Sequence, residues 1–377
     1  MRKTAIVTLI LGAAVFTLSG PLTANARVAT VTKMDAGGYT SCAIVTGGRV
    51  KCWGDNGQGA LGDGGGPNSP TGVFVVGLTG VLQISTSESP CALLANHHVK
   101  CWGSGSSGQL GNGFNNDSPV PVQVSNLTSV RQMSSGYLHS CAVQTSGRVW
   151  CWGDNTNGQL GNGNNSPSNV PVRVRGIAHA VEVDAGDEYS SCARLADGSA
   201  RCWGYNQDGQ LGNGTFSDSN VPVKVKHLGR IRRIIGGYYA NCAITVTDTV
   251  RCWGDNSNGQ LGDGTTKNRK RAVATKNLAH VADMEIENGT SCAVLHSGGL
   301  KCWGDNASGQ YGDGTYHERH LPVTIGSIHN ALSVSAGWRH TCIQLAAGVV
   351  RCTGENLAGE LGDGTFSSRK RFVRSQV

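Results

Sequence analysis

The chain has 377 residues, of which 15% are charged, and its formal net charge at pH 7 is +7. Its 55 glycines and its aromatic content of only 6% indicate many tight turns, which excludes a mainly helical core and a disordered chain. The 14 cysteines indicate either disulfides formed in an oxidising compartment or a metal-binding protein.

The first residues have the features of a secretory signal peptide. A short basic head (MRK, residues 1–3) precedes an apolar run (residues 5–18) and a small-residue cleavage signature, ANA, at residues 24–26. A membrane anchor is the alternative, but an apolar run of about 14 residues is too short to span a bilayer. We therefore expect a signal peptide at residues 1–26 and a secreted chain, extracellular or periplasmic and without a membrane span, at residues 27–377.

The rest of the sequence consists of seven copies of one unit. Each copy contains two cysteines ten positions apart, and successive copies begin 49 to 51 residues apart. A fixed period of about 50 residues is typical of an array in which each unit buries its apolar faces against its neighbours. The two cysteines of each copy are Cys42 and Cys52, Cys91 and Cys101, Cys141 and Cys151, Cys192 and Cys202, Cys242 and Cys252, Cys292 and Cys302, and Cys342 and Cys352.

Within each copy the two cysteines flank a predicted β-hairpin. In the first copy, pairing Cys42 with Cys52 places Ile44 opposite Val50, and both faces of the strand pair are largely apolar. Opposed residues in an antiparallel pair have Cα atoms about 4.5 to 5.5 Å apart, which suits a disulfide. We expect one disulfide within each hairpin. A zinc site is disfavoured because the sequence contains no CxxC.

After the second cysteine comes W-G-D-N-x-x-G-Q-L-G-[DN]-G, a run dense in turn residues. A calcium loop is disfavoured because the acidic residue is not kept: the position of Asp55 holds Ser104 in the second copy and Tyr205 in the fourth. A variable linker, a V-P-V-x-V strand and a strand before the next glycine-rich corner follow. Each copy therefore has four short strands, the number in a propeller blade.

The consensus G-x-x-H-[ST]-C-A-x-x-x-x-G-x-V-x-C-W-G-x-N-x-x-G-Q-L-G-x-G-T resembles the repeat of the regulator of chromosome condensation family, and the resemblance covers the whole mature chain. It implies an all-β fold, a seven-bladed β-propeller of four-stranded antiparallel blades. Known members have unrelated functions and share protein binding through loops on one face, so the resemblance implies binding without naming a partner. The seventh copy departs from the pattern, with Thr353 in place of the tryptophan.

The two ends of the chain predict how the ring closes. The first strand is expected at residues 28–35, and residues 371–377 match the V-P-V-x-V strand. We expect this C-terminal strand to pair with the N-terminal blade, because such pairing leaves no open sheet edge.

Aromatic residues occur at the corner just before the first cysteine of several copies. Equivalent corners of a propeller lie on one face, so we expect these rings to gather around one mouth of the ring and to form a protein-binding hot spot. Packing inward between the blades is the alternative. The motif GWRHT (residues 337–341) matches one on the interaction face of a plant photoreceptor of the same family. The predicted binding residues are Tyr39, Tyr137, Tyr189, Tyr238, Tyr239, Trp338 and Arg339.

Two other functions remain open at this point. Basic clusters at residues 267–271 (KNRKR) and 369–371 (RKR) favour, as an alternative, a carbohydrate or cell-envelope binder that recognises an anionic polymer. A propeller enzyme is the third function, and its loop-borne catalytic candidates are Asp187, Glu188, Glu318, His317 and His320. We find no catalytic motif. The leading prediction is a secreted, disulfide-bonded propeller that binds an unknown protein, is not an enzyme, needs no cofactor or metal and binds no nucleic acid.

Overall fold

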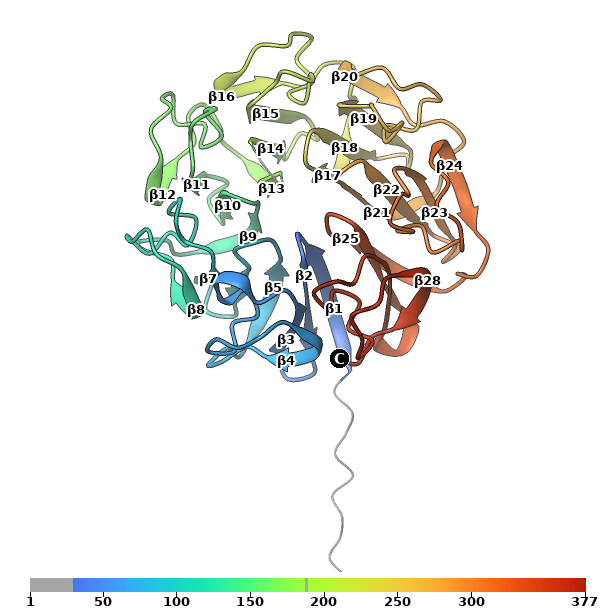
Figure 1. The fold of residues 1–377 in the computed structure, drawn as a ribbon. Helices are drawn as coiled ribbons and strands as arrows, with labels where there is room; N and C mark the ends of the chain where they lie inside the picture. The colour runs from blue at the N-terminus through green and yellow to red at the C-terminus, as the bar shows by residue number, and fades with distance from the viewer. Residues whose placement is uncertain (1–29, 187–188) are drawn as a thin grey trace, which may run out of the picture.

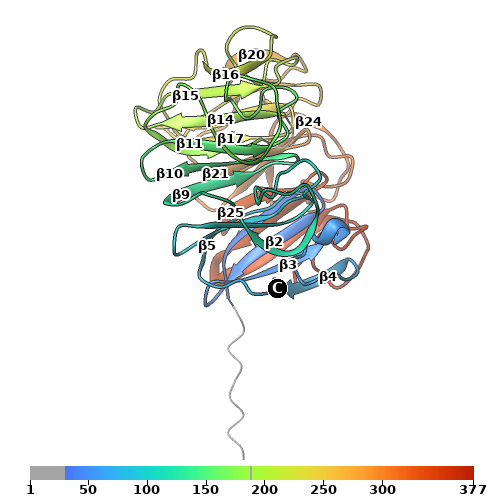
Figure 2. The same ribbon diagram turned by 90° about the vertical axis from the view of Figure 1, so that its left-hand side faces the viewer.

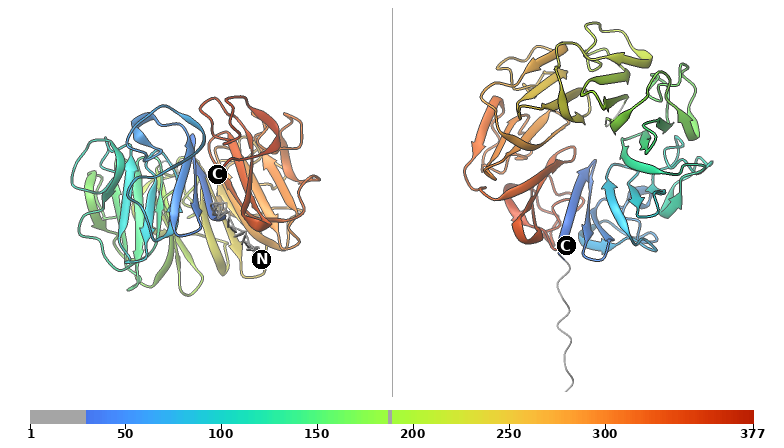
Figure 3. Two further views of the ribbon diagram at one scale, coloured as in Figure 1. Left: turned by 90° about the horizontal axis from the view of Figure 1, so that it is seen from below. Right: turned by 180° about the vertical axis from the view of Figure 1, so that it is seen from behind.

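The structure is a computed structural model that describes residues 30–186 and 189–377. In these residues, 28 strands form seven four-stranded antiparallel sheets, which are arranged as blades around a central axis (Figure 1). Seen edge-on, the blades stand side by side in the ring (Figure 2), and the view from behind shows the same order of blades (Figure 3). The predicted seven-bladed β-propeller is confirmed. The predicted signal peptide lies outside the described residues.

Each blade takes its four strands in chain order from the central axis outwards. The innermost strands are β1 (Val31–Gly37), β5 (Val81–Ser85), β9 (Val130–Ser135), β13 (Ala180–Asp184), β17 (Ile231–Gly236), β21 (Val281–Glu287) and β25 (Ala331–Ala336). The second strands are β2 (Thr40–Val45), β6 (Cys91–Leu94), β10 (His139–Gln144), β14 (Ser190–Leu195), β18 (Ala240–Thr245), β22 (Thr290–Leu295) and β26 (His340–Leu345).

The outer half of each blade contains the end of the hairpin and one further strand. The third strands are β3 (Arg49–Gly54), β7 (Val99–Gly103), β11 (Val149–Gly153), β15 (Ala200–Gly204), β19 (Val250–Gly254), β23 (Leu300–Gly304) and β27 (Val349–Gly354). The outermost strands are β4 (Ser69–Phe74), β8 (Ser118–Gln123), β12 (Ser168–Arg173), β16 (Ser219–Lys224), β20 (Arg269–Ala274), β24 (Arg319–Ile325) and β28 (Arg369–Arg374). Two short 3-10 helices, η1 (Gly57–Gly59) and η2 (Ala346–Gly348), occur in turns.

The cysteines form disulfides within the hairpins, as the sequence predicted. In every blade the two cysteines are directly opposed across the second and third strands, and their Cα atoms are 4.0 to 4.1 Å apart. The bonds join Cys42 to Cys52, Cys91 to Cys101, Cys141 to Cys151, Cys192 to Cys202, Cys242 to Cys252, Cys292 to Cys302 and Cys342 to Cys352.

The disulfides have two consequences for the fold. All 14 cysteines are bonded, so none is available to bind zinc. Each disulfide joins two strands of one sheet and therefore stiffens its own blade without linking it to the next.

The tryptophans of the W-G motif pack the blades against one another. Trp53, for example, is fully buried, and its indole Nε1–H donates a hydrogen bond of 2.8 Å to the carbonyl oxygen of Glu360 in the preceding blade. The tryptophans of blades two to six make the same bond to the blade before them, at 2.8 to 2.9 Å. A buried indole donor needs such an acceptor, so this contact fixes how adjacent blades are spaced.

The contact between blades six and seven is built differently, because the seventh copy has Thr353 instead of tryptophan. The Thr353 hydroxyl lies within hydrogen-bond distance of two carbonyl oxygens, that of Gly309 in blade six at 3.0 Å and that of Arg369 in its own blade at 2.8 Å. The volume is made up by larger residues: Tyr311 replaces the leucine found in the other copies, and Phe372 of β28 packs over Gly312, where other blades place tryptophan. Tyr311 is fully buried, and its hydroxyl donates to the carbonyl oxygen of Gly304.

The ring does not close as the sequence had led us to expect. The C-terminal strand β28 pairs with β27 of its own copy, and the N-terminal blade is complete as β1-β2-β3-β4. Both ends of the chain therefore contribute whole blades, and no strand is left over to exchange. The ribbon shows the first blade beside the last (Figures 1 and 3).

Side-chain packing and a few hydrogen bonds hold the first and last blades together. A core that includes Val45, Trp53 and Leu361 fills the space between them, and the Ala36 backbone N–H donates to the Ser335 hydroxyl at 2.9 Å. The last residues touch the first blade at one backbone bond, from Gly72 N–H to the carbonyl oxygen of Gln376, at 3.0 Å. The closing contact thus resembles the five other blade contacts that contain a W-G tryptophan.

In six of the seven blades the turn after the third strand is organised by a buried asparagine, whereas the second blade has Gly105 at that position. Asn256 accepts a hydrogen bond from the Leu261 backbone N–H at 2.9 Å and donates to the carbonyl oxygens of Thr265 and Lys267. These bonds satisfy both ends of the amide and leave no oxygen cage for calcium in that turn. Within residues 30–186 and 189–377, no group of three or more His, Cys, Asp or Glu side chains is arranged to hold a metal ion.

Candidate functional site

The corners between first and second strands lie against the turns that follow the third strands. Gly54, at the end of β3, has φ of 106°, and a Cβ atom there would lie 2.3 Å from the carbonyl oxygen of Tyr39. That oxygen accepts a hydrogen bond from the Asp55 backbone N–H at 3.0 Å, and Tyr239 and Asp255 make the same bond at 2.9 Å. The seven corners and the seven turns after the third strands therefore share one end of the ring, which we call the corner face. We call these turns the W-G turns, after the sequence that begins six of them; the seventh begins with Thr353-Gly354.

The aromatic residues of the corners meet at this face. The Trp338 ring is central: its centroid lies 4.9 Å from that of Tyr39, 5.4 Å from that of Tyr137 and 6.3 Å from that of Tyr238. These residues come from four different blades and are widely separated in sequence. Edge-to-face and tilted ring contacts at such distances stabilise each other modestly and fix the ring orientations.

A second run of contacts joins the remaining rings to this group. The Tyr238 and Tyr239 centroids are 4.3 Å apart, and Tyr205 lies 6.1 Å from both Tyr239 and Tyr189. All six rings predicted from the sequence therefore belong to one connected group. We call it the aromatic cluster, and its members are Tyr39, Tyr137, Tyr189, Tyr205, Tyr238, Tyr239 and Trp338.

The aromatic cluster is partly exposed and held by backbone contacts. Its rings are neither fully buried nor fully exposed, in contrast to the W-G tryptophans, which fill the space between blades. The Trp338 backbone N–H donates to the carbonyl oxygen of Gly38 at 3.1 Å, and the Asn288 side chain donates to the carbonyl oxygen of Trp338 at 3.1 Å. Fixed and partly exposed rings lose little conformational freedom when they meet a partner.

Sequence reasoning missed Tyr205 as part of the aromatic cluster. The residue takes the place of the aspartate in the W-G turn of the fourth blade, next to the corner that holds Tyr189. That single departure from the repeat was the available signal. Arg339, the predicted basic member of the site, is exposed, and its guanidinium lies 3.5 Å from the carboxylate of Glu355.

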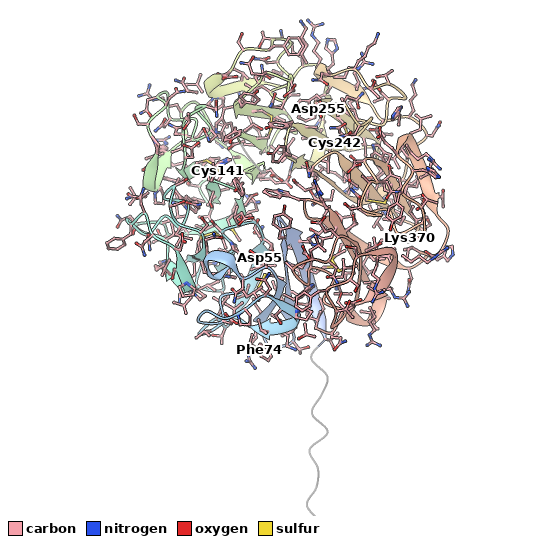
Figure 4. All side chains as sticks on the ribbon, in the orientation of Figure 1. Asp55, Phe74, Cys141, Cys242, Asp255 and Lys370 are labelled. Atoms are coloured by element: carbon pink, nitrogen blue, oxygen red, sulfur yellow. A yellow bond between two sulfur atoms is a disulfide. The ribbon has the colours of Figure 1, made fainter. Side chains whose placement is uncertain are left out.

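The other sequence candidates lie away from the aromatic cluster. The basic residues of β20 and β28 are on the outermost strands, and Lys370 is at the outer edge of the ring (Figure 4). His320 and Glu318 form an exposed pair at 2.9 Å on β24 and its approach. His317 is exposed just before Glu318, and the catalytic candidates Asp187 and Glu188 lie outside the described residues.

The innermost strands enclose a polar cavity of 270 Å³ along the axis. Three partly buried carboxylic acids line it from the same position of three copies, each directly opposite the first cysteine of its own blade: Asp35, Asp184 and Glu285. Arg233 is the cation beside them, paired with Asp283 and 3.6 Å from Glu285. Comparison of the seven copies shows that these acids occupy equivalent positions, but only the closed ring brings them together in one cavity.

Burial raises the pKa of all three acids. Desolvation of the charged form is the largest cause, and it raises the pKa of Asp35 to about 7, that of Asp184 to about 6 and that of Glu285 to about 8. Hydrogen bonds oppose the effect at Asp35, which accepts one from the Thr86 backbone N–H at 2.6 Å. Arg233 lowers the pKa of each acid, but less than burial raises it.

This cavity predicts a pH-dependent stability. Because these acids have higher pKa values folded than unfolded, the folded protein binds more protons between about pH 4 and pH 8, and its stability falls as pH rises through that range. We expect the melting temperature to drop between about pH 5 and pH 8, and we expect Asp35→Asn, which keeps the Thr86 contact, to reduce that drop. The exposed residue Asp197 is the control, since Asp197→Asn should leave the drop in melting temperature between these pH values unchanged. Equal drops in the unmodified chain and in Asp35→Asn would contradict the assignment.

Among the described residues, no helix is long and apolar enough to cross a membrane. The seven disulfides suggest an oxidising, extracellular environment.

The geometry defines a class of protein: a disulfide-bonded propeller whose distinctive surface is a group of aromatic side chains on one face. A family model described as "RCC1-like domain" matches residues 18–341, and the chain belongs to this family, as its repeats had indicated. The protein is similar in fold to human WBSCR16, with 20% identity, a TM-score of 0.76, and coverage of 87% of this chain and 94% of that chain.

Two structures of a yeast protein are also similar. Prp20p from Saccharomyces cerevisiae, described with its binding properties to Gsp1p and histones, has 18% identity and a TM-score of 0.74 over 92% of this chain and 87% of that chain. Yeast RCC1 (Prp20) bound to Kap60 has 20% identity and a TM-score of 0.73 over 82% of this chain and 78% of that chain. At these identities the likeness concerns the fold.

Proposed function

We propose that this protein is a secreted protein-binding module whose partner docks on the corner face over the aromatic cluster. The observation that carries the proposal is the meeting of seven partly exposed rings from five blades in one group. Tyrosine and tryptophan dominate the energetic centres of protein interfaces, because they bury large surfaces at a low cost in conformational entropy. The yeast relative described as binding Gsp1p and histones supports a binding role for this fold.

Export of the chain is part of the proposal. The signal-peptide pattern at residues 1–26 and the seven disulfides both agree with secretion. The protein would then meet its partner outside the cytoplasm, which disfavours nucleic acid as the ligand. Recognition through aromatic rings needs neither catalysis nor a cofactor.

A second candidate function is recognition of an anionic polymer, such as a polysaccharide or envelope polymer, by the outer edge of blades five to seven. Lys270 and Lys370 are exposed at matching positions, and their Nζ atoms lie 5.0 Å from the Phe216 ring and 5.3 Å from the Tyr316 ring. We favour the corner face because the neighbouring arginines Arg269 and Arg369 are already paired with Asp263 and Asp363 in their own blades.

The proposal predicts a large loss of binding when the aromatic cluster is truncated. The variant Tyr137→Ala/Tyr238→Ala/Trp338→Ala removes three rings in contact around Trp338, and truncation of such centres costs about 2 kcal/mol or more each. We expect the affinity for a partner captured from the native extracellular milieu and identified by mass spectrometry to fall at least a hundredfold, as measured by titration calorimetry.

The matched control is Lys270→Ala/Lys370→Ala at the outer edge, which should retain full affinity. Circular dichroism and melting curves establish that both variants fold. Full affinity in the aromatic variant, or loss of affinity in the lysine variant alone, would assign binding to another surface.

A further inference from the structure

The corners and W-G turns of the corner face are acidic although the chain as a whole is basic. The corners and W-G turns contain a single Lys or Arg, namely Arg339, which is paired with Glu355, whereas the formal net charge of the chain is +7. The described residues of these segments contain ten partly exposed carboxylates. They are Asp55, Glu88, Asp154, Asp208, Asp255, Asp305 and Glu355, which precede the G-Q-L-G sequence or lie in a corner, and Asp63, Asp313 and Asp363, which follow it.

The opposite end of the ring has the opposite charge. Six links there join the outermost strand of one blade to the innermost strand of the next, and they contact the hairpin turns through backbone bonds such as Val81 N–H to the carbonyl oxygen of Gly48. These links contain Arg175, Lys226, Arg230 and Lys276 and no aspartate or glutamate. Charge is thus separated across the ring, and a positively charged partner is attracted to the corner face.

A pocket of 190 Å³ opens on the corner face between blades five and six. Tyr238, Tyr239, Asp255, Gln260 and Asn288 are among the residues that line it. The Asp255 carboxylate is oriented by the Gln260 side-chain amide at 2.6 Å and by the Ser257 hydroxyl at 2.8 Å. Within the described part of the chain, no Lys, Arg or His side chain lies within ion-pair distance of it.

A second carboxylate adds to the negative charge beside this pocket. Asp208, in the W-G turn of the neighbouring blade, accepts a hydrogen bond from the Asn268 side chain at 3.0 Å. Burial and, next, the Asp255 charge raise the pKa of Asp208, which shows that the two carboxylates repel each other. A cation that entered this region would relieve that repulsion.

We infer that the partner segment that docks on the aromatic cluster is a basic protein loop, and that one of its Lys or Arg side chains enters the pocket lined by Tyr238, Tyr239 and Asp255. A pocket lined by aromatic rings and a carboxylate suits a guanidinium or ammonium group, which stacks on the rings and forms charge-assisted hydrogen bonds. The apolar part of the loop covers Trp338. This inference rests on the proposed function and specifies the chemistry of the partner.

The test uses defined loops in place of the unidentified partner. A displayed library of disulfide-cyclised twelve-residue peptides is selected on the full, oxidised protein, and the strongest binder is synthesised. We expect the selected loops to contain an aromatic or aliphatic residue close to a Lys or Arg. Replacement of that basic residue by an uncharged isostere, citrulline for arginine, should weaken binding at least tenfold, and Asp208→Asn/Asp255→Asn should weaken the original peptide by a similar factor.

Two further variants separate the possible failures. Asp197→Asn removes a carboxylate from the opposite end of the ring and should leave the peptide affinity unchanged. If Asp197→Asn weakens binding as much as Asp208→Asn/Asp255→Asn does, the effect comes from net charge alone and the inference is overturned. Peptides that lose affinity in the Tyr137→Ala/Tyr238→Ala/Trp338→Ala variant but not in Asp208→Asn/Asp255→Asn overturn the basic-loop inference alone. If the peptides bind both variants with unchanged affinity, the proposed function is overturned as well.

Discussion

Reduction of the seven disulfides should lower the melting temperature of this protein by tens of degrees or abolish the folded state. Each disulfide joins cysteines ten positions apart, and closing so short a loop stabilises the folded state by at most about 2.8 kcal/mol in the chain-entropy model. Seven such contributions exceed the roughly 5–15 kcal/mol by which proteins are typically stable. Melting curves with and without a reductant, followed by circular dichroism, measure the effect.

The matched control is a single blade. Replacing both Cys242 and Cys252 by alanine removes one disulfide from a buried strand pair and should cost about 2–3 kcal/mol, because the other six blades keep theirs. Peptide mapping without reduction should find only links within hairpins. A link between two blades, or a reduced chain that melts within a degree or two of the oxidised one, would contradict the expectation.

At the contact between blades six and seven, we expect a triple substitution to preserve the stability of the protein, although two of its single substitutions each reduce it. Thr353→Trp alone would force an indole into space held by Tyr311 and Phe372, and such overpacking costs about 1–3 kcal/mol. Tyr311→Leu alone leaves a void and removes the donor to the Gly304 carbonyl, with a loss of similar size. The triple variant Tyr311→Leu/Thr353→Trp/Phe372→Ala recreates the contact between blades four and five, so its stability should approach that of the unmodified protein.

Urea denaturation of the single and triple variants measures this coupling, since residues in contact give non-additive losses. Trp253→Ala, at an ordinary contact between blades, provides the scale: it deletes a fully buried indole and should cost about 3–5 kcal/mol. If the losses of the single variants simply add in the triple variant, the three residues do not compensate one another.

The expectation that was confirmed, the pairing of the cysteines, depends on residues of a single hairpin. The expectation that was wrong, the way the ring closes, depends on residues at the two ends of the chain. Cys42 and Cys52 face each other because a two-stranded hairpin with a short turn leaves few other registers, and the same holds for the other six pairs, from Cys91 with Cys101 to Cys342 with Cys352. The expected exchange of the C-terminal strand failed because it depended on how the two ends of the chain meet. Once β28 pairs with β27, as in every other copy, the first blade has no missing strand to be supplied.

The candidate site shows the same division. The period of the repeat placed Tyr39, Tyr137, Tyr238 and Trp338 at equivalent corners, and a ring of equivalent corners brings them to one face. Nothing in the period indicated that Trp338 would lie between the other three, or that Tyr205 would join Tyr189 to Tyr239. Those contacts depend on side-chain directions across blade boundaries.

The sequence by itself determined the seven copies, the four strands of each blade, the pairing of every cysteine and the family, because each of these follows from spacing within a single repeat. Only the tertiary structure decided how the ring closes, how Tyr311 and Phe372 replace a missing tryptophan, and that Asp35, Asp184 and Glu285 share one cavity with raised pKa values. The physical reason is that packing, desolvation and ring contacts arise between residues that the chain separates by one or more whole repeats. Their energies exist only once the blades stand next to one another.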